Sequence, residues 1–245
     1  MSRRRFYVPR DSIRNGTAAL PSDQAHHLRD VLRLSTGDPV EIFDGEGSGY
    51  LGEVELRGAE VLVCRLQSLP SPSLPDSLIL AAALIKPAKF EWMLQKTTEL
   101  GVSEIVPLKT RLSERQPPVS RLKPRLERWN RILQEAAKQC GRFAPPRLQE
   151  PLEFLEFLGR KELSPCHKLL FYEKAVAPWQ ADKELQHGKT ILCIGPEGGW
   201  ERGEVDQAIE AGFRAYSLGP WTLRAETAAV AAVAIVQHQI SLIRK

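Results

Sequence analysis

With 245 residues, 42% of them hydrophobic and 26% charged, the chain has the size and composition of a soluble globular protein of one or two domains. No apolar run is long enough to span a membrane or follows the basic N-terminus as in a secretory signal, and the four cysteines form no CxxC or CxxH pair, so we expect a cytoplasmic protein without a metal site. The formal net charge is only +4, so the placement of the basic residues says more about a partner than their total.

The first 70 residues predict a small β-rich module. Residues 39–43 and 50–56 alternate as strands do and are separated by a glycine-rich turn, and residues 60–66 predict a third strand. Before them, residues 22–32 predict a short capped helix.

Residues 71–76 combine proline with serine and predict a linker, and from residue 77 onward predicted strands alternate with helices. Such alternation is typical of an α/β fold with a largely parallel sheet. The expected elements are strand 78–85, a helix opened by Pro87 and ended by Gly101, strand 104–108, a helix from about 123 with Cys140 on its apolar face, strands 168–172 and 190–194, helix 201–211, strand 214–218 and helix 225–243.

Basic residues gather in two stretches of the chain. Ten Lys or Arg residues stand against three Glu between Arg111 and Arg147, and seven arginines lie between Arg3 and Arg33. Concentrated positive charge favours a polyanionic partner such as RNA, although a solvated helix face is the alternative interpretation.

Two of the expected strands end in unusual loops. Gly195-Pro196-Glu197-Gly198-Gly199-Trp200 follows strand 190–194, and Gly219-Pro220-Trp221-Thr222-Leu223-Arg224 follows strand 214–218. Glycines at a strand end let the backbone approach a ligand closely, and ligands of α/β folds gather at this edge of the sheet. Neither GxxxxGK[ST] nor GxGxxG is present, and two ordinary turns remain the alternative.

These loops carry a family resemblance. The run Ile194–Gly199 with Leu218-Gly219 and Leu223–Ala228 resembles the RsmE family of 16S ribosomal RNA (uracil-N3) methyltransferases, which belong to the SPOUT class. Further matching stretches follow in the expected order over nearly the whole chain, at residues 4–8, 27–33, 43–45, 96–102, 128–132 and 135–142.

The resemblance implies a PUA-like RNA-binding β-barrel at 1–70, a linker at 71–76 and a SPOUT methyltransferase domain with a C-terminal trefoil knot at 77–245. It also implies a homodimer that takes part in ribosome biogenesis. The implied cofactor is S-adenosylmethionine, held by knot loops. The residues expected to bind it are Leu170, Phe171, Glu173, Ile194, Gly195, Pro196, Glu197, Gly198, Leu218, Gly219, Pro220, Thr222 and Leu223.

The implied reaction defines the catalytic candidates. Uracil N3 carries a proton and is a poor nucleophile until that proton leaves, so the site must accept the proton or stabilise the resulting anion. Arg224 suits the anion, and Glu197 or Glu226 suits the proton, while Glu226 is equally placed to cap the last helix. The family commonly has arginine where this chain has Trp221, which puts one RNA contact in doubt unless a base stacks on the indole.

The implied substrate is 16S ribosomal RNA, within the assembled small subunit. The residues expected to contact it are Arg3, Arg4, Arg5, Arg10, His27, Arg29, Arg33, Lys89, Arg128 and Arg142. Three alternatives remain open at this point: a SPOUT enzyme acting on another RNA position such as a ribose 2′-hydroxyl, a non-enzymatic ribosome-assembly factor, and a metabolic α/β enzyme that binds phosphate at the Gly195–Gly199 turn.

Overall fold

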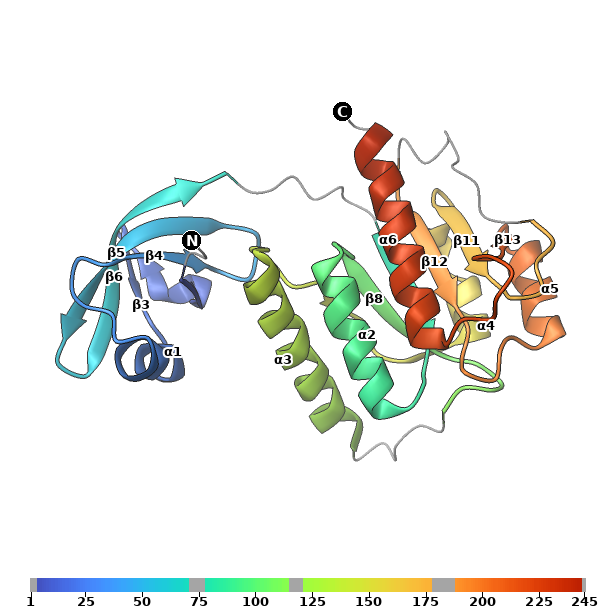
Figure 1. The fold of residues 1–245 in the computed structure, drawn as a ribbon, viewed down its shortest axis with the longest axis horizontal. Coiled ribbons are helices and arrows are strands. Elements are labelled where there is room, and N and C mark those ends of the chain that lie inside the picture. The colour runs from blue at the N-terminus through green and yellow to red at the C-terminus, as the bar shows by residue number, and fades with distance from the viewer. Residues whose placement is uncertain (1–3, 71–77, 115–120, 178–187, 244–245) are drawn as a thin grey trace. The chain divides into compact units, whose positions relative to one another are not determined.

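A computed structural model of the chain describes residues 4–70, 78–114, 121–177 and 188–243 (Figure 1). The chain divides into two compact units. The N-terminal unit comprises Met1–Ser73 and Gln134–Pro145, and the parallel-sheet unit comprises Leu74–Leu133 and Pro146–Lys245. The expected linker, 71–76, lies outside the described residues.

The N-terminal unit is built on a six-stranded sheet with the order β1-β4-β5-β6-β3-β2. β1 pairs parallel with β4, and the other neighbours pair antiparallel. Its strands are β1 (Arg5–Tyr7), β2 (Ile13–Arg14), β3 (Thr17–Ala19), β4 (Pro39–Phe43), β5 (Gly49–Arg57) and β6 (Glu60–Leu69). Phe6, Leu28 and Ile42 are fully buried in its core. The three strands expected from apolar alternation are present, whereas β2 and β3 are too short to show a period.

One helix packs into the core of this sheet. The helix α1 (Ser22–His26) continues as a π-helical turn over His27–Val31, in place of the single helix expected over 22–32. Its N-cap is Pro21, which has no side-chain donor or acceptor, so the expected side-chain cap is wrong. Short 3-10 turns lie at Arg10–Ser12 and Lys161–Leu163.

The parallel-sheet unit has seven strands, all parallel. Their order is β10-β8-β7-β12-β11-β13, and β9 also pairs with β8. The strands are β7 (Leu78–Ala83), β8 (Glu104–Lys109), β9 (Arg147–Leu148), β10 (Leu152–Glu153), β11 (His167–Phe171), β12 (Thr190–Ile194) and β13 (Arg214–Tyr216). The helices are α2 (Pro87–Glu99), α4 (Phe154–Leu158), α5 (Arg202–Glu210), α6 (Ala225–Ile243) and the first part of α3 (Leu122–Cys140). The predicted α/β class with a parallel sheet is confirmed.

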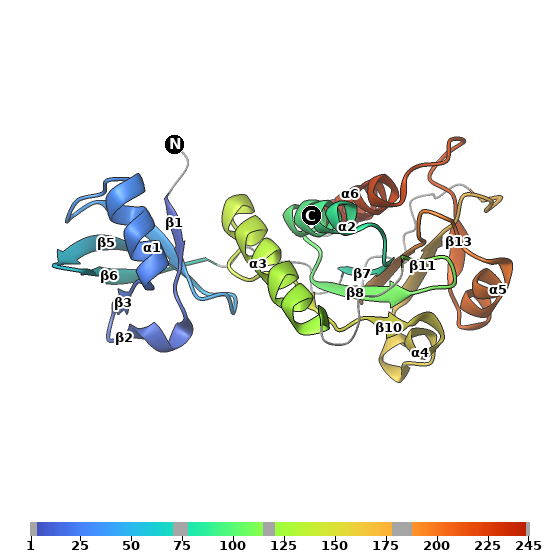
Figure 2. The same cartoon turned by 90° about the horizontal axis from the view of Figure 1, so that it is seen from below.

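Helices cover both faces of this sheet (Figure 2). Alternate residues of β7 point to opposite sides, so Leu78, Leu80 and Ala82 pack with α2, α3 and α6. Ile79 and Ala81 pack with α4 and α5 on the other side. Every residue of β7 is therefore buried, which explains why this strand reads as one unbroken apolar run rather than an alternating one.

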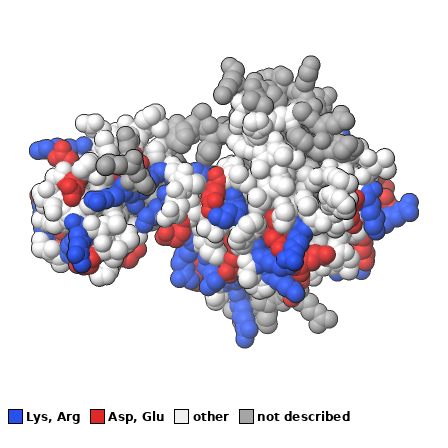
Figure 3. All heavy atoms as spheres, viewed as in Figure 1, with Lys and Arg blue, Asp and Glu red and all other residues white. Residues whose placement is uncertain are grey.

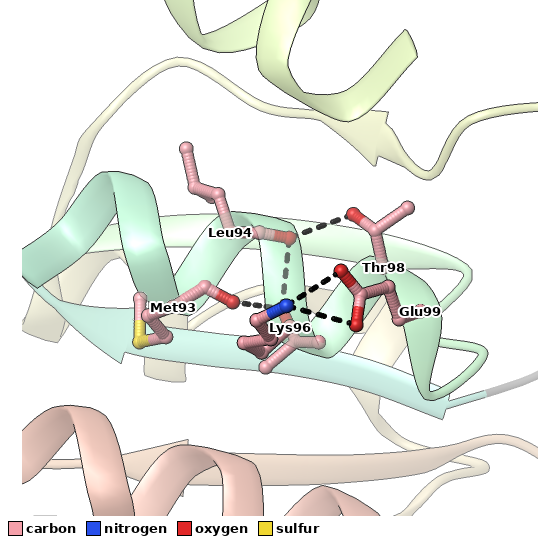
Figure 4. Close-up of polar contacts among 6 residues, drawn as sticks. Met93, Leu94, Lys96, Thr98 and Glu99 are labelled. Carbon is pink, nitrogen blue, oxygen red and sulfur yellow. Dashed lines mark hydrogen bonds and ion pairs between the residues drawn. The ribbon is translucent and has the colours of Figure 1, made fainter. Parts of the chain in front are cut away.

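The helix α2 begins where the sequence predicts, with Pro87 in its first turn and Gly101 just beyond its end at a φ of +94°. The buried Thr97 and Thr98 place hydroxyls inside the fold, and each donates a hydrogen bond to a carbonyl one turn earlier, at 2.8 Å to Met93 and 2.7 Å to Leu94. Figure 4 shows this turn of the helix, with Lys96 paired to Glu99. Each threonine hydroxyl thus bonds to a carbonyl of its own helix.

The buried face of α3 differs from the expected one at the C-terminal end of the helix. Trp129, Leu133, Ala136 and Ala137 are buried, but Cys140 is exposed. The apolar stripe ends one turn earlier than expected, and Gly141 at a φ of +91° then turns the chain.

The described part of the chain contains neither a candidate membrane-spanning helix nor a candidate metal site. None of its helices combines the length and apolarity needed to cross a bilayer. Among the described residues, no group of three or more His, Cys, Asp or Glu is arranged to hold a metal ion.

Candidate functional site

The carboxyl ends of β11, β12 and β13 lie side by side, and the loops that follow them enclose a cavity of about 750 Å³. The loops supply residues 171–174, 194–200, 218–219 and 221–225, and the start of α2 adds Lys86 and Lys89. A cavity of this size is typical of a site for a small molecule or cofactor. Its position is the edge of a parallel sheet at which ligands gather in α/β folds.

The floor of the cavity depends on Trp200. Its indole Nε1 donates a hydrogen bond of 3.0 Å to the carbonyl of Phe171, and so joins the ends of two neighbouring strands. The same ring packs against Phe154 at an interplanar angle of 38°, with centroids 4.8 Å apart. A Cβ on Gly195 would lie 2.8 Å from Nε1, so only glycine fits beneath the indole. Trp200 thus fixes the shape of this loop.

The walls combine apolar side chains with backbone and carboxylate groups. Ile194, Leu218 and Leu223 supply apolar surface. Gly199 turns at a φ of +77°, and a Cβ there would lie 3.2 Å from the carboxylate of Glu173. All residues expected to bind the cofactor line this cavity except two: Leu170 is fully buried in the core on the α4 and α5 side, and Pro220 is outside the lining.

A charged cluster lies at the α2 side of the cavity. The ammonium of Lys89 forms a close ion pair with Glu197 and lies 3.7 Å from Oε1 of Glu226. The hydrogen bond that Lys89 donates to Glu197 raises the pKa of Lys89, Glu226 adds to this effect, and Arg224 opposes it. Lys89 is therefore a fixed cation rather than a proton acceptor.

The two carboxylates of this cluster differ in access. Glu197 lines the cavity, and its side chain is 30% exposed. Glu226, in the first turn of α6, is 12% exposed, and its Oε2 is buried with no hydrogen-bond partner among the described residues. Glu197 is therefore more accessible to a ligand than Glu226, which contacts Lys89 from a more buried position.

The lining also includes residues outside the set expected to bind the cofactor. They are Lys86, Tyr172, Lys174, Gly199, Trp200, Trp221, Ala225 and Ala228. These residues come from different loops and meet only through the sheet order. Trp221, noted in the sequence as a departure from the family on which a base could stack, lies on the lining and is 81% exposed.

The candidate RNA-binding residues of the N-terminal unit divide into exposed and interior ones. Arg4, Arg10 and Arg33 are exposed, although Arg10 forms a 2.7 Å ion pair with Glu46. His27 is half-buried beside the ring of Phe6, and Arg29 donates to the carbonyl of Ala59. Arg3 lies outside the described residues.

Arg5 and Arg142 belong to the interior of the same unit. The Arg5 guanidinium lies between two rings, 5.5 Å from the centroid of Phe43 and 5.3 Å from that of Phe143, and it pairs with Glu41. Burial lowers the pKa of both arginines, and Glu41 partly offsets this for Arg5. Through Phe143 and the carbonyl of Arg142, Arg5 contacts the segment Gln134–Pro145 within the unit.

Some residues of the two basic stretches are paired with carboxylates. Arg128 of α3 forms a two-pronged ion pair with Glu91 of α2, which raises the pKa of Arg128. Figure 3 shows basic and acidic side chains intermixed over one face of the molecule. At Arg128 the charge of the second basic stretch is therefore paired across elements that lie far apart in the chain.

Comparison with known proteins gives consistent matches over both units. The model of the RNA methyltransferase domain matches residues 72–237, and that of the RNA methyltransferase PUA domain matches residues 20–66. Ribosomal RNA small subunit methyltransferase E of Synechocystis is 34% identical over 94% of this chain and 76% of its own length; the Bacillus subtilis protein of that name is 28% identical over 93% and 92%. The crystal structure of that enzyme from Neisseria gonorrhoeae, bound to S-adenosyl methionine, matches with a TM-score of 0.86 at 29% identity, covering 96% of this chain and 97% of its own.

Proposed function

The chain belongs to the RsmE family of ribosomal RNA small subunit methyltransferases, and from that membership we propose that it methylates N3 of a uridine in 16S ribosomal RNA with S-adenosylmethionine as donor. The observation that carries the proposal is the cavity at the ends of β11, β12 and β13, in a chain that matches these methyltransferases over nearly its whole length. The choice of uracil N3 among RNA atoms rests on the motifs at 194–199 and 223–228.

The cavity residues fit the methyl donor. An adenine ring needs apolar walls and backbone hydrogen bonds, which Ile194, Leu218 and Leu223 and the glycine-rich loops offer. The carboxylate of Glu173, beside Gly199, suits the donor's positive charge. When bound, S-adenosylmethionine supplies an electrophilic methyl group.

The protein's own groups prepare the base. Glu197 faces the cavity and accepts the N3 proton, while Lys89 holds its carboxylate in place. Arg224 lines the same cavity, where its guanidinium stabilises the negative charge that develops on the uracil. Glu226 positions Lys89 from behind.

The N-terminal unit contributes RNA binding in this proposal. Its sheet carries the match to the PUA domain of RNA methyltransferases, and the exposed arginines Arg4 and Arg33 suit phosphate contacts. We expect the substrate to be the assembled small ribosomal subunit.

The test is methyl transfer to small subunits purified from cells that lack the modification. We expect one methyl group per subunit, mapped by mass spectrometry to N3 of a single uridine of 16S ribosomal RNA. Transfer to a ribose 2′-hydroxyl would overturn the choice of atom. A chain that neither binds S-adenosylmethionine in isothermal titration nor transfers a methyl group would overturn the enzymatic proposal itself.

We also propose that the enzyme is a homodimer, with the trefoil knot of the SPOUT class in its parallel-sheet unit. Ala229 and Ala232 of α6 are fully buried within their own subunit, so they contribute nothing to a partner, whereas Ile235 is 37% exposed and free to do so. Light scattering at micromolar concentration is expected to give twice the mass of one chain, and a monomeric mass would contradict the dimer.

A further inference from the structure

We propose that Trp221 is a stacking platform for the nucleotide that flanks the target uridine, so that the mouth of the cavity grips single-stranded RNA. This inference rests on the proposed function and adds to it the residue that holds the neighbouring base.

The exposure of Trp221 is the first observation. Its side chain is 81% exposed, whereas the other tryptophans that the structure describes are at most 44% exposed. Residues 219–224 are all exposed, and Gly219 at a φ of +131° turns the loop outward after Leu218. A large aromatic surface left in water on the lining of a ligand cavity indicates a binding partner.

The charges around the indole identify the partner's chemistry. Lys86 and Lys174 line the same cavity, and neither has an ion-pair partner among the described residues. Lys89, by contrast, is neutralised by Glu197. Unpaired cations beside an exposed aromatic ring are the combination that binds single-stranded nucleic acid, because phosphates meet the cations while a base stacks on the ring.

The position of Trp221 favours a flanking base over the reacting one. The reacting uracil must reach Glu197, whose side chain is 30% exposed, among walls that include Ile194, which is 2% exposed. The indole, exposed to 81%, is the far more solvent-accessible part of the same lining. A flanking base stacks equally before and during the reaction, so Trp221 contributes to binding of the RNA and not to the chemical step.

The experiment measures steady-state methyl transfer to unmodified small subunits by Trp221→Ala, Trp221→Leu and Trp221→Phe. Loss of one stacked base is expected to raise KM by about 5- to 150-fold with kcat unchanged. Trp221→Phe keeps an aromatic face and should stay near the wild type. Trp221→Leu keeps apolar surface without that face and should behave as Trp221→Ala.

Trp92→Ala is the matched control, because Trp92 is an exposed tryptophan of the same unit that does not line the cavity, and its KM should equal that of the wild type. Isothermal titration should show unchanged S-adenosylmethionine affinity in every variant. The stacking role is overturned if Trp221→Ala leaves KM unchanged, or if its kcat falls by as large a factor as its KM rises. It is also overturned if Trp221→Leu has the same KM as Trp221→Phe. A loss of dimer mass in Trp221→Ala overturns it as well, and would assign the indole to a second copy of the chain. Each of these outcomes leaves methyl transfer by the wild type unchanged, so it would overturn the role of Trp221 without overturning the proposed function.

Discussion

Glu197→Gln is expected to lower kcat for methyl transfer by about 10²- to 10⁴-fold, the usual contribution of a positioned proton acceptor. Glu197 lines the cavity, whereas Glu226 is set behind Lys89 with one oxygen buried. The amide keeps the shape of the side chain but cannot take the N3 proton of uracil. Single-turnover methyl transfer at saturating small subunits and S-adenosylmethionine measures the change directly.

The pH dependence separates a proton acceptor from a residue that only supports the fold. At alkaline pH the uracil loses its N3 proton to solvent, so the rate of Glu197→Gln should rise with pH and approach that of the wild type. Glu226→Gln is the matched control, since it also removes a carboxylate near Lys89. It should have a smaller effect on kcat, without alkaline rescue. A Glu197→Gln enzyme whose deficit is constant across pH would contradict its assignment as the proton acceptor.

Sequence reasoning succeeded where one local pattern decides the structure. The strand β12 and the helix α6 have the expected bounds, and Pro87 and Gly101 mark the two ends of α2. Each depends on a period, a helix-opening proline or a glycine at positive φ, all of which neighbouring residues determine.

The cavity itself depends on long-range structure. Trp200 reaches the carbonyl of Phe171, 29 residues earlier in the chain, and this contact exists only because β11 and β12 are neighbours in the sheet. No spacing rule places the two together. The glycine-rich motif nevertheless identified the loop, because a missing side chain at Gly195 is a local property even though the indole that requires it is not.

The distribution of charge along the sequence was the least informative feature for predicting which cations lie at the cavity. The stretch between Arg111 and Arg147 is basic in sequence, but Arg128 is paired with Glu91, and Arg142 is buried in the N-terminal unit. The cavity cations that have no ion-pair partner among the described residues are Lys86, Lys174 and Arg224, and they belong to neither basic stretch. Counting charges along the chain misses pairing across elements, which decides the field that an RNA phosphate meets.

Arg224→Ala is expected to lower kcat by about 10²- to 10³-fold, as the loss of one group that stabilises developing negative charge does. Arg224 lines the cavity, is exposed, and has no ion-pair partner in the part of the chain that the structure describes. Its guanidinium is therefore free to meet the uracil oxygens as charge builds on them. Methyl transfer at saturating substrate reports kcat, and isothermal titration reports the affinity for S-adenosylmethionine, which should change far less.

Two further variants identify how Arg224 acts. Arg202→Ala removes an exposed arginine of α5 that does not line the cavity, and it should match the wild type. Arg224→Lys keeps the charge but loses the planar donor pair, so it should recover only part of kcat. If Arg224 instead binds an RNA phosphate, Arg224→Ala should raise KM with kcat unchanged and reduce the salt dependence of RNA binding by about one charge. If Arg224→Ala loses donor affinity and activity by the same factor, Arg224 is part of the wall of the donor pocket. A group that acts on the reacting base would lower activity without lowering donor affinity.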